Sequence, residues 1–153
     1  MIATAIIRAA QAEDWPRVRS LLSGAGLPTI DLTTDSLSDF LVAADAGEVV
    51  GIVAVERCDE HGLLRSLVVD PAWRGTGLGR ALVSAAEDAA ARRELHSLTL
   101  LTQTAATFFR SLDYHDIARN DAPAAVRATT EFTHLCPSSS TCLTKRVADM
   151  HHD

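Results

Sequence analysis

The chain has 153 residues, of which 47% are hydrophobic and 22% are charged. This length and balance predict one globular domain over residues 1–153 with a core of its own, and they argue against two full domains. Fourteen Lys and Arg residues against twenty Asp and Glu residues give a formal charge of −6, so there is no basic field to hold a nucleic acid.

The longest apolar run and the cysteine count restrict the cellular setting. Residues 49–55 form that run, which is far shorter than the roughly 20 residues needed to span a bilayer. Three cysteines, Cys58, Cys136 and Cys142, are an odd number in a chain of ordinary length and give little support to a disulfide framework. We therefore expect a cytoplasmic protein with reduced thiols and no membrane partner.

The first half of the chain predicts a strand, a helix and three further strands. Residues 6–8 begin the first strand, and Trp15, Val18, Leu21 and Leu22 recur at helical spacing. The remaining elements of this half are a loop, a helical turn, a buried hairpin and another strand, at residues 24–34, 35–39, 40–44 with 49–57, and 63–69.

The second half alternates helices with strands. A stripe of small and apolar residues predicts an amphipathic helix over residues 77–93. Pro123 opens a second helix that reaches Leu135, with Ala125 and Phe132 on the same face. A short helix and three strands complete the series, at residues 105–112, 98–101, 114–118 and 142–147. This order predicts an α/β fold with a mixed sheet and helices on both faces.

The segment after residue 69 carries the most specific signal in the chain. A strand ends at Asp70-Pro71, and three glycines, Gly75, Gly77 and Gly79, open the long helix. A helix N-terminus offers unpaired N–H groups and a positive dipole end, and glycines let a diphosphate approach those amides. The segment lacks the lysine of a P-loop and the G-x-G-x-x-G spacing of a dinucleotide fold. A glycine-rich turn that serves only strand-to-helix packing is the alternative.

This segment resembles the acyl-CoA loop of the GNAT N-acetyltransferases. The family pattern Q/R-x-x-G-x-G/A is met by Arg74, Gly77 and Gly79, and Val69-Asp70-Pro71 leads into it as in the family. The resemblance extends over most of the chain. It implies a GNAT-like α/β (α+β) fold, a mostly antiparallel sheet of six to seven strands flanked by helices on both faces, and an N-acetyltransferase that uses acetyl-CoA.

The resemblance also implies which residues bind the cosubstrate. Loop amides would hold the CoA diphosphate, and the preceding strand would pair with the pantetheine. A backbone N–H of Val68 or Val69 would stabilise the tetrahedral oxyanion. Arg110 is a further candidate, with an exposed helix position as the alternative. The implied acetyl-CoA contacts are Leu67, Val68, Val69, Arg74, Gly75, Thr76, Gly77, Leu78, Gly79, Arg80 and Phe109.

Two positions depart from the family pattern for acid–base catalysis. Arg65 stands where many members carry a Glu, and Phe109 stands where many carry a Tyr. A thiol such as that of CoA has a pKa of about 8.5 and leaves as a thiolate without help from a general acid. The amine still has to lose a proton, for which Glu56, Glu131 or a water relay are the candidates. Either carboxylate could equally be a solvated surface group.

Arg65 lies in an otherwise apolar strand, where an unpaired charge would be costly. Its guanidinium either binds an oxyanion of the substrate or forms an internal salt bridge with Glu56, Asp70 or another acid. The first interpretation implies a small anionic or zwitterionic amine as the substrate. The resemblance places Ser66 and Thr102 at the opening of the sheet as substrate contacts, with hydrogen-bonded structural roles as the alternative.

A closer resemblance, outside the loop, is to the GNAT branch associated with arsenic-resistance operons. It implies a role in arsenical resistance. The three cysteines could in principle offer sulfur ligands to trivalent arsenic, with buried structural thiols as the alternative. The matching segments are Gly26-Leu27-Pro28, Phe108-Phe109 and residues 63–67, 100–102 and 136–142.

Two functions from different classes remain open. The first is an acetyl-CoA-dependent N-acetyltransferase acting on a small amine, and the second is a regulatory module that binds acetyl-CoA or a metalloid and has lost catalysis. Transfer to protein lysines or N-termini is a third. Neither His115 nor His134 has a partner at metal-binding spacing, so we expect no metal. A homodimer is an expectation from the resemblance alone.

Overall fold

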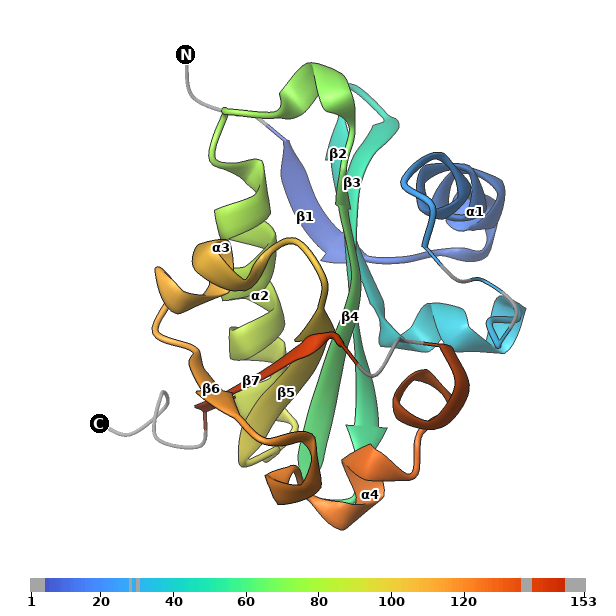
Figure 1. Cartoon of the computed structure of the whole chain (residues 1–153). Coiled ribbons are helices and arrows are strands. Elements are labelled where there is room, and N and C mark those ends of the chain that lie inside the picture. Colours follow the sequence, from blue (N-terminus) through green and yellow to red (C-terminus); the bar gives the residue numbers. More distant parts are fainter. Residues whose placement is uncertain (1–4, 28, 30, 136–138, 148–153) are drawn as a thin grey trace. The chain divides into compact units, whose positions relative to one another are not determined.

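The computed structural model describes residues 5–27, 29, 31–135 and 139–147 (Figure 1). Seven strands in this part of the chain form one sheet in the order β1-β2-β3-β4-β5-β7-β6, mostly antiparallel, which confirms the predicted fold class. Within these residues no helix is both long and apolar enough to cross a membrane. The chain divides into two compact units, Met1–Ala54 with Ser66–Ala86 and Val55–Arg65 with Glu87–Asp153.

The first unit contains the predicted N-terminal strand and hairpin. Strand β1 (Ile6–Ala9) pairs antiparallel with β2 (Phe40–Asp45), which pairs antiparallel with β3 (Glu48–Cys58). The connection between β2 and β3 is Ala46-Gly47, and both residues have positive φ, 52° and 86°. Two central residues of positive φ match the right-handed twist of the strands that a tight hairpin joins.

Helix α1 (Trp15–Gly24) and helix α2 (Leu78–Arg92) cover opposite faces of β3. The apolar face of α1 packs into a core that includes Ile52. A Cβ on the preceding residue, Gly51, would lie 2.9 Å from Leu82 Cδ1 of α2. Because successive strand residues point to opposite faces, Ile52 meets α1 and Gly51 admits α2. The glycine therefore sets how closely the N-terminal half of α2 approaches the sheet.

The second unit is built around strand β7 (Thr141–Arg146). It lies between β5 (Ser97–Thr102) and β6 (His115–Ile117) and pairs antiparallel with both. Strand β4 (His61–Val69) pairs parallel with β5 at its start. Helix α3 (Ala106–Arg110) and the 3-10 turn Arg119–Asp121 also belong to this unit. Three further 3-10 turns belong to the first unit, at Ala12–Asp14, Thr34–Asp39 and Pro71–Trp73.

A partly buried ion pair joins helix α2 to strand β7. The ammonium of Lys145 donates to both carboxylate oxygens of Glu87, at 3.1 Å each, and to the backbone oxygen of Leu112 at 3.0 Å. It also lies over the ring of Tyr114, 5.5 Å from the centroid. Burial, with the negative charge of Glu87 in support, raises the pKa of the Tyr114 phenol well above its ordinary value.

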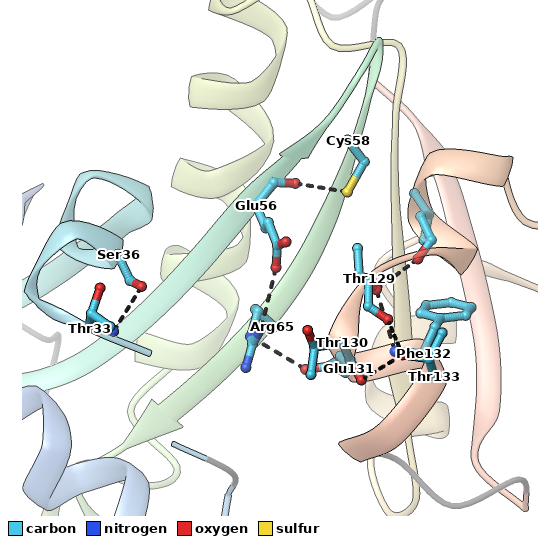
Figure 2. A network of polar contacts seen from close by, with 11 residues as sticks. Thr33, Ser36, Glu56, Cys58, Arg65, Thr129, Thr130, Glu131, Phe132 and Thr133 are labelled. Carbon is cyan, nitrogen blue, oxygen red and sulfur yellow. Dashed lines mark hydrogen bonds and ion pairs between the residues drawn. The ribbon is translucent and has the colours of Figure 1, made fainter. Parts of the chain in front are cut away.

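One predicted helix is wrong in extent. The helix expected from Pro123 to Leu135 is divided into α4 (Ala124–Arg127) and a π-helical turn, Glu131–Leu135. The side chain of Thr129 donates to the carbonyl three residues before it at 2.7 Å, which ends the regular ladder (Figure 2). Threonine hydroxyls compete with the backbone for such bonds, and the 3.6-residue spacing of the apolar positions does not reveal that competition.

Helix α2 ends in a strained position at Glu94. The N–H of Glu94 donates to the carbonyl of Ala91, and the N–H of Leu95 donates to that of Ala90, at 3.0 Å each. These two bonds form a Schellman motif, whose residue at the Glu94 position is usually glycine. Glu94 has φ of 63°, in the left-handed region that a Cβ disfavours.

We predict that Glu94→Gly raises the free energy of unfolding by about 0.5–1 kcal/mol, because glycine adopts positive φ without the Cβ clash. Urea unfolding followed by circular dichroism measures the change. Glu94→Ala is the matched control, since it removes the same carboxylate and keeps the Cβ. An equal gain in both variants would locate the effect in the charge and would contradict this explanation.

Candidate functional site

The loop that follows β4 is anchored at Asp70. Its N–H donates to the backbone oxygen of Val50 at 2.8 Å, which continues the contact with the hairpin beyond the end of the strand. Its carboxylate Oδ1 accepts from the N–H of Ala72 at 2.9 Å and caps the 3-10 turn Pro71–Trp73. The loop therefore starts from a fixed residue.

The glycines then turn the chain into helix α2. Gly75 and Gly77 have φ of 79° and 88°, a region in which only glycine is unstrained. Between them, the hydroxyl of Thr76 donates to the backbone oxygen of Trp73 at 2.6 Å and closes the turn. Helix α2 begins at Leu78, so its first N–H groups, which have no partner within the helix, follow the glycines directly. This is the arrangement of an anion-binding helix N-terminus.

The side chains of this segment have different environments. Val68 and Leu78 are buried, and Val68 belongs to the core of the first unit, so only its backbone can take part in chemistry. Leu67, Val69 and Gly79 are partly buried. Arg74 and Arg80 are exposed, as cations that meet the phosphates of a ligand must be.

We predict that Gly77→Ala weakens binding of CoA about tenfold or more, because the added Cβ opposes the positive φ that aims the amides of the loop. Isothermal titration with CoA measures the dissociation constant. Gly24→Ala is the control, since it makes the same substitution in the same unit at a position with open space and without positive φ. Unchanged affinity in Gly77→Ala would contradict a role for this turn in binding.

A second cluster, in the other unit, centres on Arg65. Its side chain is 4% exposed, and two carboxylates contact the guanidinium (Figure 2). Nη1 lies 3.3 Å from Glu56 Oε1 of β3, and Nε lies 3.4 Å from Glu131 Oε1 of the π-helical turn. The two carboxylates differ in environment, because the Glu56 side chain is 37% exposed and that of Glu131 only 8%.

This cluster brings together both carboxylates that the sequence suggests as bases. Of the interpretations open for Arg65, the internal salt bridge is present, and it involves Glu56 and Glu131 rather than Asp70. One guanidinium between two carboxylates gives the three side chains a formal charge of −1. A buried charge needs such compensation, and arginine keeps its charge in proteins.

Thr129 also sets the position of Glu131. Its hydroxyl oxygen accepts from the N–H of Phe132 at 3.4 Å, and its carbonyl accepts from the hydroxyl of Thr133 at 2.9 Å (Figure 2). The turn that carries Glu131 is thus held on both sides by side-chain bonds to the backbone. The spacing of apolar residues in the sequence does not indicate this turn.

The two predicted substrate contacts besides Arg65 are Ser66 and Thr102. Ser66 is partly buried and has φ of 62° within β4, an unusual conformation for a residue that is not glycine. The hydroxyl of Thr102 accepts from the N–H groups of Thr104 and Ala105, at 3.3 and 2.9 Å, and so has a structural role at the turn before α3.

Phe109 is buried in an aromatic cluster. Its ring meets Phe108 and Tyr114 edge to face, with centroids 5.1 and 5.3 Å away. The alternative for Arg110 is present, because its exposed guanidinium forms two bonds to Asp116, at 2.8 and 2.7 Å. That ion pair raises the pKa of Arg110 and lowers the pKa of the Asp116 carboxyl.

Two of the three cysteines lie in the described part of the chain. Cys58 and Cys142 are buried members of the same apolar core, and the Cys58 thiol donates to the backbone oxygen of Glu56 at 3.5 Å. Burial raises the pKa of the Cys142 thiol to about 11. Cys136 lies outside the described residues, and among those described no group of three or more His, Cys, Asp or Glu could hold a metal ion.

We predict that Cys142 of the folded protein reacts with iodoacetamide at pH 8 about 100-fold more slowly than in the unfolded chain, because only the thiolate reacts. Mass spectrometry of the labelled peptide gives the rate, and protein in urea is the control. A pKa raised by folding contributes stability that is complete below pH ~8.5 and declines as the pH rises towards the folded value. Equal rates in the folded and unfolded protein would contradict the buried, neutral thiol.

Comparison with known proteins settles the family. The family model of the acetyltransferase (GNAT) domain matches residues 36–116, which is 81 of the 153 residues. The chain belongs to the GNAT acetyltransferases. The matched region contains the glycine loop of the first unit, helix α2, and Glu56 and Arg65 of the second unit.

Relatives of the chain agree with this assignment. An uncharacterized N-acetyltransferase of Chlorobaculum tepidum is 27% identical over 140 residues, which cover 88% of this chain and 87% of the relative. The fold is similar to N-acetylglutamate synthase from Neisseria gonorrhoeae, solved with CoA and N-acetylglutamate, with a TM-score of 0.83 and 20% identity. That match covers 96% of this chain but only 36% of the synthase, so the chain spans about a third of that protein.

Two more structures extend the likeness to proteins of similar length. A Mycobacterium tuberculosis protein solved in complex with CoA has a TM-score of 0.78 at 22% identity, over 92% of this chain and 98% of its own. The ribosomal-protein-S18-alanine N-acetyltransferase from Escherichia coli has a TM-score of 0.70 at 16% identity, over 95% of each chain.

Family membership supports the first of the two classes of function. The chain is a GNAT N-acetyltransferase with acetyl-CoA as its cosubstrate. The Glu and Tyr that many members use for acid–base chemistry are absent at Arg65 and Phe109, so the groups that move protons have to come from elsewhere in the chain or from water.

Proposed function

We propose that the protein transfers the acetyl group of acetyl-CoA to the amine of a small zwitterionic compound of the amino-acid type. The observation that carries the proposal is the asymmetric pairing of Arg65. Glu131 is buried with it, whereas Glu56 is partly exposed and contacts it at 3.3 Å. The Arg65–Glu56 contact is therefore the half of the cluster that a solute can reach.

The need to compensate each charge in the cluster favours a zwitterionic substrate over other amines. A substrate carboxylate that replaces Glu56 on the Arg65 guanidinium leaves the Glu56 carboxylate without its partner. An ammonium group in the same substrate compensates that carboxylate, so every charge keeps an opposite neighbour. A simple anion would leave Glu56 uncompensated, and a simple cation would compete with the charge of Arg65. Insertion of a zwitterion into an ion pair is the exchange that avoids both costs.

The same exchange gives Glu56 a role in proton transfer. A carboxylate that holds the substrate ammonium is within reach of its proton and can accept it. The nitrogen lone pair then attacks the thioester carbonyl, a C–N bond forms, and the C–S bond breaks. The tetrahedral oxyanion formed in this step needs a hydrogen-bond donor such as a backbone N–H. CoA leaves as a thiolate and takes the second proton of the nitrogen, which needs no tyrosine because thiolates are good leaving groups.

Two further considerations concern the substrate. The synthase from Neisseria gonorrhoeae, which shares the fold, was solved with the N-acetylated amino acid N-acetylglutamate, and this supports an amino acid or an analogue here. The sequence resemblance to the arsenic-resistance branch narrows the class to arsenical analogues of amino acids. The residues that carry this narrower assignment are Gly26-Leu27-Pro28, Phe108-Phe109 and residues 63–67, 100–102 and 136–142.

We predict that acidic and neutral amino acids and their phosphinate and arsenical analogues release CoA thiol, whereas polyamines do not. Glu56→Gln should lower kcat/KM for the amine about 10- to 100-fold, the range for one charge-assisted hydrogen bond, and leave CoA affinity within twofold. A thiol-release assay measures the first and titration the second. Glu60→Gln, at an exposed carboxylate close by in the chain, is the control.

Removal of Arg65 alone would leave Glu131 buried without its cation, at a cost of about 3–5 kcal/mol. The paired variant Arg65→Met with Glu131→Gln removes both charges together and keeps the test independent of folding. We expect it to raise KM for the amine about 10- to 100-fold with CoA affinity unchanged. Equal loss of amine and CoA binding would reject Arg65 as the substrate anchor.

A further inference from the structure

We propose that Arg17 of helix α1 is a positioning residue for acetyl transfer, which holds the acetyl-CoA loop in place through Asp70. The proposal rests on the family's use of acetyl-CoA and is independent of the identity of the amine. Arg17 lies outside the glycine motif, 53 residues before Asp70 in the chain. Both residues belong to the first unit.

The guanidinium of Arg17 makes two contacts that use different nitrogens. Nε donates to the backbone oxygen of Val49 at 2.9 Å, and Nη2 donates to Asp70 Oδ2 at 2.6 Å. Val49 belongs to β3, and the next residue, Val50, accepts from the N–H of Asp70. The arginine therefore joins helix α1 to strand β3 and to the first residue of the loop. The planar guanidinium holds its two donors at a fixed separation, whereas the ammonium of a lysine presents its donors from one nitrogen and does not reproduce that geometry.

Asp70 is consequently oriented from two sides. Oδ2 faces Arg17, and Oδ1 accepts from the N–H of Ala72 at 2.9 Å. The bond from Ala72, followed by that from Arg17, lowers the pKa of the Asp70 carboxyl below its ordinary value. Both contacts therefore favour the charged form of the carboxylate.

A charged carboxylate at the start of this loop has an electrostatic consequence. The amides that follow Gly77 are suited to a diphosphate, and a nearby negative charge opposes the binding of an anion. Arg17 compensates that charge and at the same time fixes the carboxylate in the orientation that caps the 3-10 turn. Loss of Arg17 would leave an uncompensated anion and a loosely oriented loop, and both effects act on acetyl-CoA rather than on the amine.

The test is a set of variants analysed by steady-state kinetics and by titration with CoA. We expect Arg17→Met to raise KM for acetyl-CoA and the dissociation constant of CoA about tenfold, with kcat at saturating acetyl-CoA within twofold of the parent. Arg17→Lys should give an intermediate value. Arg19→Met is the matched control, because Arg19 lies on the same helix and its guanidinium faces the ring of Trp15, 6.0 Å from the centroid.

A double-mutant cycle separates positioning through Asp70 from a general effect on stability. Asp70→Asn retains an oxygen that can accept from Ala72 and removes the charge. Added to Arg17→Met, it should restore at least a third of the lost CoA affinity, on a logarithmic scale. Independent, additive losses would overturn the proposal, as would an Arg17→Met variant that unfolds at a lower temperature but binds CoA normally.

CoA titration also keeps this proposal distinct from the assignment of the amine. If no amine of the zwitterionic class is acetylated, the affinity of the Arg17 variants for CoA still decides the role of Arg17. If instead the variants change KM for the amine and leave CoA binding unchanged, Arg17 does not act on the acetyl-CoA loop.

Discussion

The burial of one guanidinium constrains much of the second unit. Arg65 cannot shed its charge, so the chain has to bring carboxylates to it from elsewhere in the sequence. Glu56 lies on β3, nine residues before Arg65 in the chain. Glu131 lies on the π-helical turn, which the hydroxyl of Thr129 separates from helix α4. The irregular turn thus brings a carboxylate to the buried guanidinium of the strand, which needs one. The unequal exposure of the two carboxylates then makes one a structural partner and the other a group that solutes can reach.

The comparison of sequence with structure separates local from distant information. The glycine loop, the start of α2 and the hairpin could be predicted because their determinants are adjacent in the chain: glycines where φ is positive, and apolar residues at helical or strand spacing. The division of the predicted helix 123–135 was missed because apolar spacing does not record the bonds that a threonine hydroxyl makes to the backbone.

The site residues follow the same rule. Arg65 could be identified as a charge in need of a partner, since a cation within an apolar strand is visible in the sequence. Its partners depend on which turns lie beside the strand, so the sequence left Glu56, Asp70 or another acid open. Asp70 pairs instead with Arg17, on a helix that was predicted from the spacing of its apolar residues. That spacing gives no information about which residue a polar side chain of the same helix will contact.

The only lysine of the chain has a chemical consequence for an enzyme that handles an activated acetyl group. An amine attacks a thioester through its lone pair, and a protonated amine has none. Lys145 directs one hydrogen bond to each oxygen of Glu87 and one to the carbonyl of Leu112, so all three of its protons have acceptors. Before this nitrogen could attack a thioester, it would have to leave the acceptors that hold it, two of which belong to the carboxylate of Glu87. These contacts therefore keep the single lysine side chain apart from the reaction that the enzyme performs on other amines.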